Sequence, residues 1–235
     1  MLTLPVYKTQ SVYTVRPSKI IALGMNYREH VAESLRAQIS NQALEVPSEP
    51  ILFAKTPNVL VGTDQPIILP AILAQYDFAP GRTDYEAELA FIIKDTCRNV
   101  PEAEAYNHIY GFTCMNDVSQ RDVQRTDKSG WFRGKSFDTF GPIGPQIVLT
   151  EDIGDPHNLR IMCRLNGKTV QDSNTGAMIF SIPSMLSFIS KNLTLHEGDI
   201  IATGTPAGVG PIKAGDVVEV EIEKIGVLRN AVQAE

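Results

Sequence analysis

The sequence has few cysteines, no long apolar run and no visible targeting signal. Its 235 residues include three cysteines, Cys97, Cys114 and Cys163, which are scattered and form no CxxC pair. This spacing argues against a disulfide framework and a zinc cluster, and it favours a reducing compartment. No apolar stretch approaches about 18 residues, the length that spans a bilayer as a helix. The start, MLTLPVYKTQSVYTVRP, lacks a charged leader followed by an apolar core, so we expect a cytoplasmic protein without a secretory signal.

The chain also lacks an excess of positive charge. Lys and Arg number 21 against 27 Asp and Glu, which gives a formal net charge of −6. Nucleic acids and anionic membranes bind basic surfaces, so neither is expected as the main partner. Apolar residues make up 43% and charged residues 20%, as in an ordinary globular protein. The length suits one large domain or two small ones with a real core.

Hydrophobic patterning predicts many short strands and few helices. Apolar runs bounded by Gly, Pro or polar residues indicate strands, and Asn166-Gly167 between two runs is typical of a hairpin turn. The expected strands are 19–24, 51–55, 67–70, 89–94, 109–115, 161–165, 168–171 and 217–223, the expected helices are 25–38, 117–128 and 182–189, and the expected loops are 40–50 and 71–83. Because no regular strand–helix–strand rhythm is present, the pattern favours a β-rich protein with a few helices.

Acidic residues occupy every second position at the start of one predicted strand. TDYEAELAFII carries Asp84, Glu86 and Glu88, which would share one face because side chains in a strand alternate. Such a row is destabilising unless water or a cation offsets the repulsion. Asp117 follows an apolar run and so stands at a strand end, where functional groups often project. Glu86, Glu88 and Asp117 form the all-oxygen set that Mg²⁺ or Mn²⁺ prefers. The alternative, a solvated acidic face, is favoured by the spacing alone, and Asp84 is left outside the ligand set.

A histidine and a glutamate lie three residues apart in NYREHVAES. His30 and Glu33 would be neighbours on one face of a helix. A carboxylate bonded to one ring nitrogen fixes the tautomer and raises the basicity of the other nitrogen, as a water-activating base requires. The alternative is a surface His beside a surface Glu, which the spacing alone favours.

A lysine in an aromatic stretch and two residues of a predicted helix form a candidate anion site. Lys135 stands between Gly and Ser in WFRGKSF, a setting that can hold an ammonium in a partly desolvated pocket. Arg121 and Gln124 lie four and seven residues after Asp117, so on a helix they would share its face. The alternative is an ordinary basic surface helix.

The stretch GDIIATGTPAGVG, residues 198–210, indicates a strand that runs into a loop rich in Gly, Thr and Pro. It lacks the GK[ST] ending of a P-loop and no obvious helix follows it, so nucleotide binding is disfavoured. Exposed backbone N–H groups and the Thr205 hydroxyl of such a loop suit a small carboxylate.

Seven stretches, in this order, resemble the fumarylacetoacetate hydrolase superfamily. They are LGMNYREHVAE, PILFAKTPN, DYEAELAFII, NDVSQRDVQ, GKSFDTFGPIGP, NGKTVQDSNTGAMIFSIP and LHEGDIIATGTPAGVGPIKAGD, and they cover most of the chain from Lys19 onward. The sequence looks most like the shorter, single-repeat members, which include acylpyruvate hydrolases, oxaloacetate decarboxylases and homoprotocatechuate-pathway isomerases. We therefore expect a short N-terminal segment, 1–18, and a single catalytic domain, 19–235.

The resemblance implies a fold, a cofactor and a set of site residues. The implied fold is α+β and β-rich, with mixed β-sheets rolled into a barrel-like core and a few flanking helices. The implied assembly is a homodimer with Mg²⁺ or Mn²⁺. By motif position the metal ligands fall on Glu86, Glu88 and Asp117, the catalytic residues on His30, Glu33 and Lys135, and the substrate-binding residues on Arg121, Gln124 and Thr205. The acidic strand face is thus interpreted as a metal site.

Two departures from the family pattern bear on the substrate. Residues 34–50 and 71–83 are longer than the matching segments of short members, and both can reshape a lid over the site. Met25 precedes Asn26, where some acylpyruvate-cleaving members carry a basic residue. These departures leave the preferred acyl group open.

Three functions are compatible with the sequence. The first is a divalent-metal-dependent hydrolase that cleaves a C–C bond in a small 2,4-dioxo acid of the acylpyruvate type through a metal-stabilised enolate. His30 would activate the water and Lys135 would stabilise the oxyanion. The second is a decarboxylase or isomerase of a 2-oxo or 2-hydroxydienoate diacid such as oxaloacetate, which needs no water attack. The third, a 2-oxo-acid-binding protein without turnover, ranks last because the expected dyad and ligands are intact.

Overall fold

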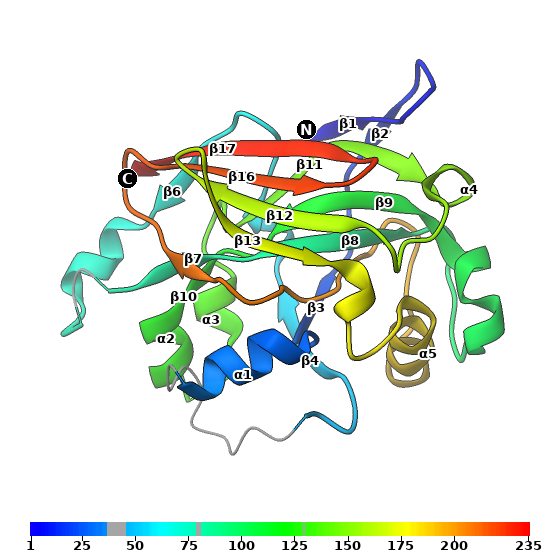
Figure 1. The fold of residues 1–235 in the computed structure, drawn as a ribbon, viewed down its shortest axis with the longest axis horizontal. Coiled ribbons are helices and arrows are strands. Elements are labelled where there is room, and N and C mark those ends of the chain that lie inside the picture. Colours follow the sequence, from blue (N-terminus) through cyan, green and yellow to red (C-terminus); the bar gives the residue numbers. More distant parts are fainter. Residues whose placement is uncertain (37–45, 79–80, 129) are drawn as a thin grey trace.

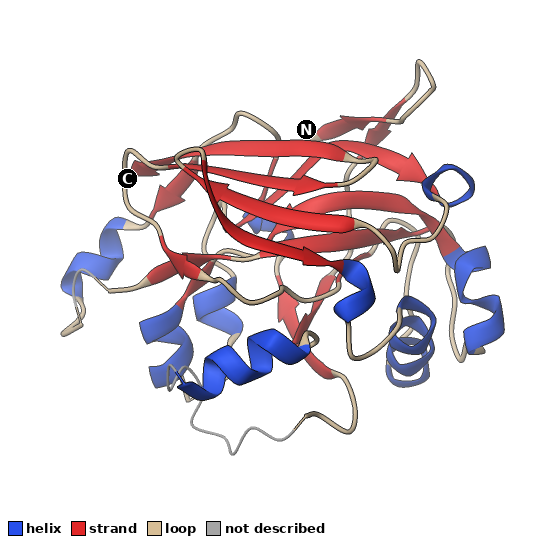
Figure 2. Ribbon diagram, in the orientation of Figure 1, coloured by secondary structure: helices blue, strands red, loops and turns tan. Residues whose placement is uncertain are grey.

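Strands dominate the structure, as the short apolar runs predict (Figures 1 and 2). The computed structural model describes residues 1–36, 46–78, 81–128 and 130–235. The strands are Thr3–Pro5 (β1), Val12–Thr14 (β2), Ile20–Gly24 (β3), Ile51–Lys55 (β4), Leu60–Val61 (β5), Ile67–Leu69 (β6), Thr83–Tyr85 (β7), Ala87–Ile93 (β8), Ile109–Asn116 (β9), Ser119–Gln120 (β10), Gly141–Leu149 (β11), Arg160–Leu165 (β12), Lys168–Asn174 (β13), Ile200–Ala202 (β14), Gly210–Pro211 (β15), Val217–Ile222 (β16) and Gly226–Ala234 (β17). The α-helices are Arg28–Arg36 (α1), Arg121–Thr126 (α2), Phe132–Lys135 (α3), Thr150–Ile153 (α4) and Ile182–Asn192 (α5), and short 3₁₀ helices cover Pro57–Val59, Ala71–Gln75, Glu102–His108 and Thr175–Ala177.

Two mixed sheets enclose the main core. The larger sheet has the strand order β4-β3-β14-β8-β9-β11-β5, and the smaller has the order β13-β12-β16-β17-β6. In the larger sheet β14 pairs parallel with β3 and antiparallel with β8, and in the smaller sheet β17 pairs parallel with β6. Strands β12 and β16 contact β8 and β9, so the curved sheets face each other. The expected class, α+β and β-rich with a barrel-like core, is confirmed.

Strand β8 is buried along its whole length because both of its faces meet apolar side chains. Leu89, Phe91 and Ile93 join the main core between the sheets, whereas Ala90 and Ile92 join a second core under the N-terminal strands. A strand covered on both faces reads as a continuous apolar run, which is how the sequence from 89 to 93 reads. The start of this rigid strand carries the acidic residues.

The predicted helix from 117 to 128 is wrong at its start. Asp117 lies outside any helix, Ser119–Gln120 pairs with β7, and α2 covers only Arg121–Thr126. The Gln120 side chain accepts a hydrogen bond from the Val123 N–H and so caps the helix at this point. Asp117 therefore does not share a helical face with Arg121, and their proximity has another cause.

The other expected elements match closely. Helix α1 follows β3, and the buried Tyr27 and Val31 fix its inner side. Asn166 and Gly167 both have positive φ, 53° and 79°, and they join β12 to β13 in the predicted hairpin. The expected loops are described only in part, since residues 37–45 and 79–80 lie outside the described residues. The expected loop 71–83 is wrong at both ends, because Ala71–Gln75 forms a 3₁₀ helix and Thr83 begins β7. The lid role suggested for 34–50 and 71–83 stays a prediction. In the described part of the chain, no helix has the length and apolar character of a membrane span.

Candidate active site

Three carboxylates converge where two neighbouring strands meet. Glu86 stands between β7 and β8, Glu88 is the second residue of β8, and Asp117 directly follows β9. The two long strands pair antiparallel with Ala87 opposite Asn116, and the Asp117 N–H donates to the Glu86 carbonyl at 2.9 Å. This register brings carboxylate oxygens of the three acids within 4.8 Å of one another, and all three side chains are buried.

These three acids fit a hard divalent cation. The group offers oxygen ligands alone, and its negative charges repel one another unless positive charge lies nearby. Among the described residues a second group, Asp95, Cys97 and His108, mixes ligand types, and its exposed Asp95 already lies 2.6 Å from the His108 imidazole. The oxygen-only group is therefore the candidate centre for Mg²⁺ or Mn²⁺.

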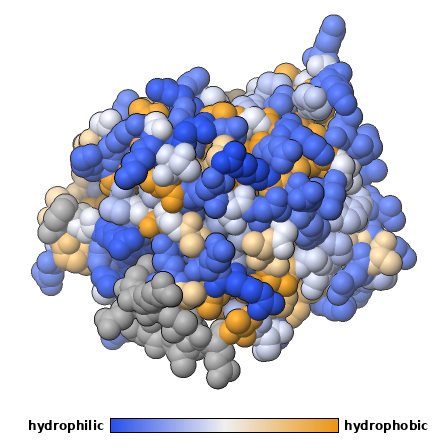
Figure 3. All heavy atoms as spheres, in the orientation of Figure 1, coloured by the Kyte–Doolittle hydropathy of each residue, from blue (hydrophilic) through white to orange (hydrophobic). Residues whose placement is uncertain are grey.

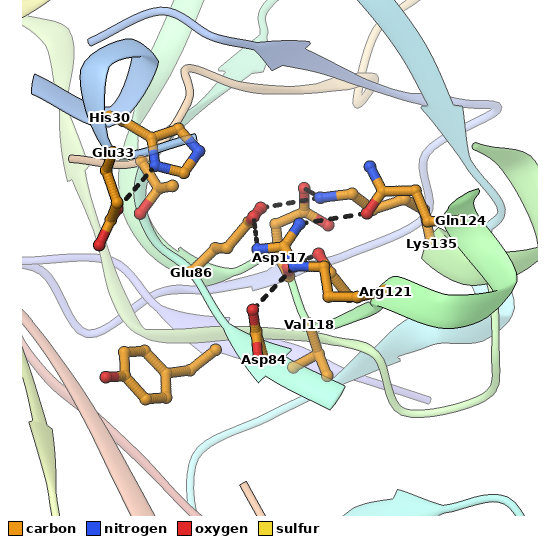
Figure 4. A network of polar contacts seen from close by, with 12 residues as sticks. His30, Glu33, Asp84, Glu86, Asp117, Val118, Arg121, Gln124 and Lys135 are labelled. Atoms are coloured by element: carbon orange, nitrogen blue, oxygen red, sulfur yellow. Dashed lines mark hydrogen bonds and ion pairs between the residues drawn. The ribbon is translucent and has the colours of Figure 1, made fainter. Parts of the chain in front are cut away.

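Buried cations contact two of the three acids (Figure 4). The Lys135 ammonium lies 2.7 Å from Glu86 Oε2 and 2.5 Å from Asp117 Oδ2, and Arg121 Nη2 lies 2.5 Å from Glu86 Oε1. Burial opposes the ionisation of Glu86, but the charges of Arg121 and Lys135 outweigh it and hold the pKa of Glu86 well below its usual range. Burial likewise opposes the charge of Lys135, yet Asp117 and Glu86 raise the pKa of its ammonium. Glu86 and Lys135 therefore stay ionised although they are buried.

Glu88 has a different environment from the other two acids. Its Oε2 accepts a hydrogen bond from the Gly204 N–H at 2.9 Å, and the described part of the chain gives it no ion pair. Burial raises the pKa of Glu88 well above its usual value, and the charges of Asp117 and Glu86 act in the same direction. Of the three acids, Glu88 most needs an additional cation to hold its charge.

Asp84 anchors Arg121. Its Oδ2 lies 2.8 Å from Arg121 Nε, and its Oδ1 lies 2.7 Å from Arg82 Nε. Burial disfavours the Arg121 charge, but Glu86 and Asp84 raise the pKa of the guanidinium further. Arg121 thus reaches the acids from the first residue of α2, and Asp84 stays outside the three-acid group.

The predicted His–Glu pair forms and faces the acids (Figure 4). His30 is 6% exposed, and its Nδ1 lies 3.2 Å from Glu33 Oε2. Burial opposes the ionisation of Glu33, but hydrogen bonds from His30 and from the Gly208 N–H lower its pKa. Because the anionic Glu33 occupies Nδ1, Nε2 is the ring nitrogen without a partner among the described residues. Burial raises the pKa of Glu86, and after Arg121 and Lys135, His30 is the next group that lowers it, so the pair acts within electrostatic range of the three acids.

The residues predicted to bind substrate lie on two sides of this group. Gln124 Oε1 accepts a hydrogen bond from Arg121 Nη1 at 3.1 Å, one helical turn further along α2. The buried Thr205 hydroxyl accepts a hydrogen bond from Gln171 Nε2 at 2.8 Å, and Gln171 Oε1 accepts another from the Ala87 N–H. The Gln171 side chain therefore links Thr205 to Ala87, the residue between Glu86 and Glu88.

Two N–H groups of the loop from 203 to 209 bind acids of the protein itself. The Gly204 N–H donates to Glu88 and the Gly208 N–H donates to Glu33 at 3.1 Å. That this loop also grips a small substrate carboxylate stays a prediction. Gly204 and Gly208 have φ values of 94° and 100°, a conformation that favours glycine. The loop uses these N–H groups to orient the acids of the site.

Lys135 reaches the acids because α3 packs very close to α2. A Cβ at Gly134 would lie 2.8 Å from both the Gln120 carbonyl oxygen and the Gln124 backbone nitrogen. The Lys135 ammonium also lies 4.6 Å from the centre of the Phe53 ring, and Phe53 contacts Trp131 edge-on. The desolvated pocket expected for this lysine is present, with the cation–π contact made by strand β4.

Sequence reasoning missed Lys55. This last residue of β4 is fully buried, and its ammonium lies 2.6 Å from Asp117 Oδ1 and 3.3 Å from the Val118 carbonyl. Burial lowers the pKa of Lys55, and the charge of Asp117 opposes that shift. Each oxygen of Asp117 thus contacts a lysine, Oδ1 from β4 and Oδ2 from α3. The available signal was a single lysine that closes the apolar run ILFAK before a proline.

Comparison with known families gives one clear match. Residues 19–233 match the family model described as fumarylacetoacetate (FAA) hydrolase C-terminal. Among curated relatives, the mitochondrial oxaloacetate tautomerase of Xenopus laevis is 43% identical over 224 residues, which cover 92% of this chain and 66% of the relative.

Solved structures give related matches. The 2-hydroxyhepta-2,4-diene-1,7-dioate isomerase from Mycobacterium marinum is 36% identical with a TM-score of 0.80, and the match covers 97% of this chain and 82% of the other. A fumarylpyruvate hydrolase from Pseudomonas aeruginosa, in complex with Mn²⁺ and pyruvate, is 26% identical with a TM-score of 0.84. The match covers 100% of this chain and 96% of the other.

Proposed function

The chain belongs to the fumarylacetoacetate hydrolase family, and from this premise we propose that it is a divalent-metal-dependent enzyme that acts on a small 2-oxo acid through its enolate. One observation carries the proposal: a buried histidine paired with a half-buried glutamate faces three converging carboxylates that contact two lysines and an arginine. This arrangement supplies a base, a cation site and positive charge for an acidic substrate in one place.

Glu86, Glu88 and Asp117 would hold the cation, Mg²⁺ or Mn²⁺. When bound, such an ion polarises a 2-oxo group and offsets the negative charge that develops on its oxygen. The Mn²⁺ and pyruvate named with the Pseudomonas structure support both the cation and the 2-oxo-acid class. Arg121 and Lys135 offset the charge of the substrate carboxylate, and Gln124 and Thr205 supply polar contacts.

The first candidate reaction is keto–enol tautomerisation of a 2-oxo diacid of the oxaloacetate type. His30 Nε2 removes a proton from the carbon next to the 2-oxo group, Glu33 stabilises the resulting imidazolium, and the proton returns to the oxygen. No carbon–carbon bond breaks and no water is consumed. The 43% identical relative named oxaloacetate tautomerase and the dienoate isomerase of the same fold support this candidate.

The second candidate is hydrolysis of a C–C bond in a 2,4-dioxo acid, with decarboxylation of a β-oxo acid as a variant that needs no water. In hydrolysis His30 takes a proton from water, the hydroxide adds to the 4-oxo carbon, and Lys135 stabilises the oxyanion. Cleavage of the C3–C4 bond then gives a carboxylic acid and the enolate of a pyruvate-type product, which is protonated. The fumarylpyruvate hydrolase that matches the full chain supports this candidate.

One substrate panel separates these reactions. The wild-type protein with Mg²⁺ or Mn²⁺ is offered oxaloacetate, fumarylpyruvate and acylpyruvates, and the loss of enol absorbance and the release of pyruvate are measured separately. Loss of enol without pyruvate identifies tautomerisation, pyruvate from oxaloacetate identifies decarboxylation, and pyruvate from a 2,4-dioxo acid identifies hydrolysis.

Three variants test the roles of the residues. His30→Ala is expected to lower kcat by about 10²- to 10⁴-fold, the usual contribution of a general base. Glu86→Gln is expected to abolish the response to added metal. His108→Ala is the matched control, since His108 also pairs with an acid but lies outside the site, and it is expected to keep wild-type activity. The metal-dependent function would be refuted if neither a chelator nor the Glu86→Gln substitution lowered turnover.

We also propose that the protein is a homodimer, as the resemblance implies. Size-exclusion chromatography with light scattering is expected to give twice the mass of the chain, and a mass of one chain would contradict it. The cytoplasmic location stays a prediction, and the Xenopus relative is named as mitochondrial.

A further inference from the structure

Most of the buried polar atoms without a partner belong to residues that adjoin the candidate site along the chain. In the described part of the chain these atoms are Tyr27 Oη, Thr63 Oγ1, Asn116 Nδ2, Gln120 Nε2 and Ser136 Oγ. All but the threonine belong to residues that stand in the NYREH stretch or directly beside Asp117, Arg121 or Lys135. A buried donor without an acceptor lowers stability, so native proteins keep few of them. Their concentration here indicates groups that bind something beyond the folded chain alone.

Tyr27 is one of the fully enclosed members of this group, with 1% of the residue exposed. It directly precedes α1, and its neighbour Asn26 donates from Nδ2 to the Thr203 carbonyl at 2.8 Å. A Cβ built on Gly204 would lie 2.8 Å from the Asn26 Cβ, so the two loops are in close contact. The Gly204 N–H in turn holds Glu88 Oε2 at 2.9 Å. The Tyr27 loop is therefore packed on the turn that holds Glu88.

The electrostatics agree with this packing. Burial raises the pKa of the Tyr27 hydroxyl, and the charge of Glu88 raises it further. The hydroxyl therefore stays protonated, as a hydrogen-bond donor, within the field of that carboxylate.

Glu88 is an acceptor with spare capacity. A carboxylate can accept about four hydrogen bonds, and the described residues give Glu88 one, from Gly204. Glu86 and Asp117 each contact two buried cations. A buried donor without an acceptor thus belongs to the loop packed on the turn that holds Glu88, the acid that accepts the fewest hydrogen bonds.

We propose that Tyr27 is a positioning residue for Glu88, whose hydroxyl donates a hydrogen bond to the Glu88 carboxylate when a divalent cation is bound. This inference rests on the proposed metal-dependent function. Carboxylates that bind metals are themselves held by hydrogen bonds, and the loss of such an outer partner typically costs about 10- to 100-fold in metal affinity or activity. The hydroxyl would fix the orientation of Glu88 and keep its lone pairs aimed at the cation.

The test is Tyr27→Phe, which removes one oxygen and keeps the ring. Mn²⁺ affinity is measured by the electron paramagnetic resonance signal of the free ion, and the melting temperature is measured in excess chelator. We expect the Mn²⁺ dissociation constant to rise about 10- to 100-fold. We expect the melting temperature in chelator to stay equal or rise, because the variant no longer buries an unpartnered hydroxyl. If Tyr27 were purely structural, Tyr27→Phe would lower the melting temperature in chelator and leave the Mn²⁺ dissociation constant unchanged.

Tyr85→Phe is the matched control. The Tyr85 hydroxyl is also largely buried near the site, but it donates to the Gly208 carbonyl at 2.8 Å. Its loss is expected to lower the melting temperature in chelator and to change Mn²⁺ affinity by less than about twofold, because it removes a hydrogen bond without touching Glu88.

Two results would overturn the inference, and they differ from failure of the function itself. Tyr27→Phe that binds Mn²⁺ as tightly as the wild type refutes the role of Tyr27 and leaves the metal site intact. Tyr27→Phe that melts well below the wild type in chelator makes the residue structural. A wild-type protein that binds no Mn²⁺ refutes the metal-dependent function, and this inference with it.

Discussion

At the scale of single residues, Glu86 and Glu88 lie two positions apart and differ in their partners. Glu86 contacts Arg121 and Lys135, whereas Glu88 has the Gly204 N–H. In excess chelator, Glu86→Gln removes the negative charge that pairs with the buried Arg121 and Lys135. We therefore expect the free energy of unfolding to fall by about 3 kcal/mol. Glu88→Gln removes a carboxylate whose charge burial disfavours, and we expect that free energy to stay equal or rise.

Denaturant unfolding at one pH in the presence of chelator checks this pair of substitutions, because each variant serves as the control of the other. Both variants are expected to lose Mn²⁺ binding. If Glu88→Gln is as stable as the wild type, a general defect in folding cannot explain its loss of Mn²⁺ binding. Equal destabilisation by the two substitutions would contradict the different environments of the two acids.

The acids and the dyad were predictable as residues because their types and spacing repeat a family pattern. Lys55 was not, because a lysine at the end of an apolar strand gives no sign of which acid it meets. Its partner Asp117 lies 62 positions away in the sequence, and the contact depends on how β4 packs beside the site. Local patterns identify candidate donors and acceptors, whereas the tertiary fold decides their pairs.

At the scale of elements, helix α5 has Ser181 as its N-cap, and its first backbone N–H binds a histidine from a preceding loop. The Ile182 N–H, at the first turn of α5, donates to His157 Nε2 at 3.1 Å. Burial lowers the pKa of His157, although Asp155 acts in the opposite direction. The pKa of His157 in the folded protein therefore lies below the unfolded value of about 6.5. The contribution of the neutral imidazole to the free energy of unfolding is present above that pH and is lost as the pH falls. Protonation removes the acceptor and adds positive charge at a helix N-terminus.

The expected result is a difference in pH profile. From pH 7.5 to pH 5 the wild type should lose about 1 kcal/mol more unfolding free energy than His157→Gln, which cannot titrate. Chemical denaturation across this range measures it, with His196→Gln as a control for titration of another histidine. Parallel profiles for the wild type and His157→Gln would exclude this role of the imidazole.

Element prediction failed where a long-range pairing outweighed local composition. Residues 117–128 are polar and charged enough for a helix, but Ser119 and Gln120 pair with Thr83 and Asp84 of β7 and delay the helix to Arg121. This short pairing also places Arg121 beside Asp84, which the helical-face argument did not foresee. The hairpin at Asn166-Gly167 was predictable because its turn chemistry is entirely local.

At the scale of the whole molecule, the candidate site links parts of the chain that are distant in sequence. Glu86 comes from the junction of β7 and β8, Glu88 from β8, and Asp117 from the position after β9. The cations come from β4, α2 and α3, and the dyad comes from α1 (Figures 1 and 4). The surface seen in Figure 3 mixes polar and apolar residues. The acids and cations of the site are buried. A cation held by Glu86, Glu88 and Asp117 would therefore stabilise the fold as well as the site.

The size of this stabilisation follows from binding linkage. Free Mn²⁺ at about one hundred times its dissociation constant adds about 2.7 kcal/mol to the free energy of unfolding. For a domain of this length, each kcal/mol shifts the melting temperature by about 2–4 °C, so we expect an increase of about 5–11 °C that a chelator reverses. Asp117→Asn is the control, because it removes a ligand and is expected to melt at the same temperature with and without Mn²⁺. The three acids join segments that are distant in sequence, which is why a cation held there would stabilise the whole fold. An equal increase in the wild type and in Asp117→Asn would mean that Mn²⁺ stabilises the protein from another site, because the variant lacks one of the three ligands.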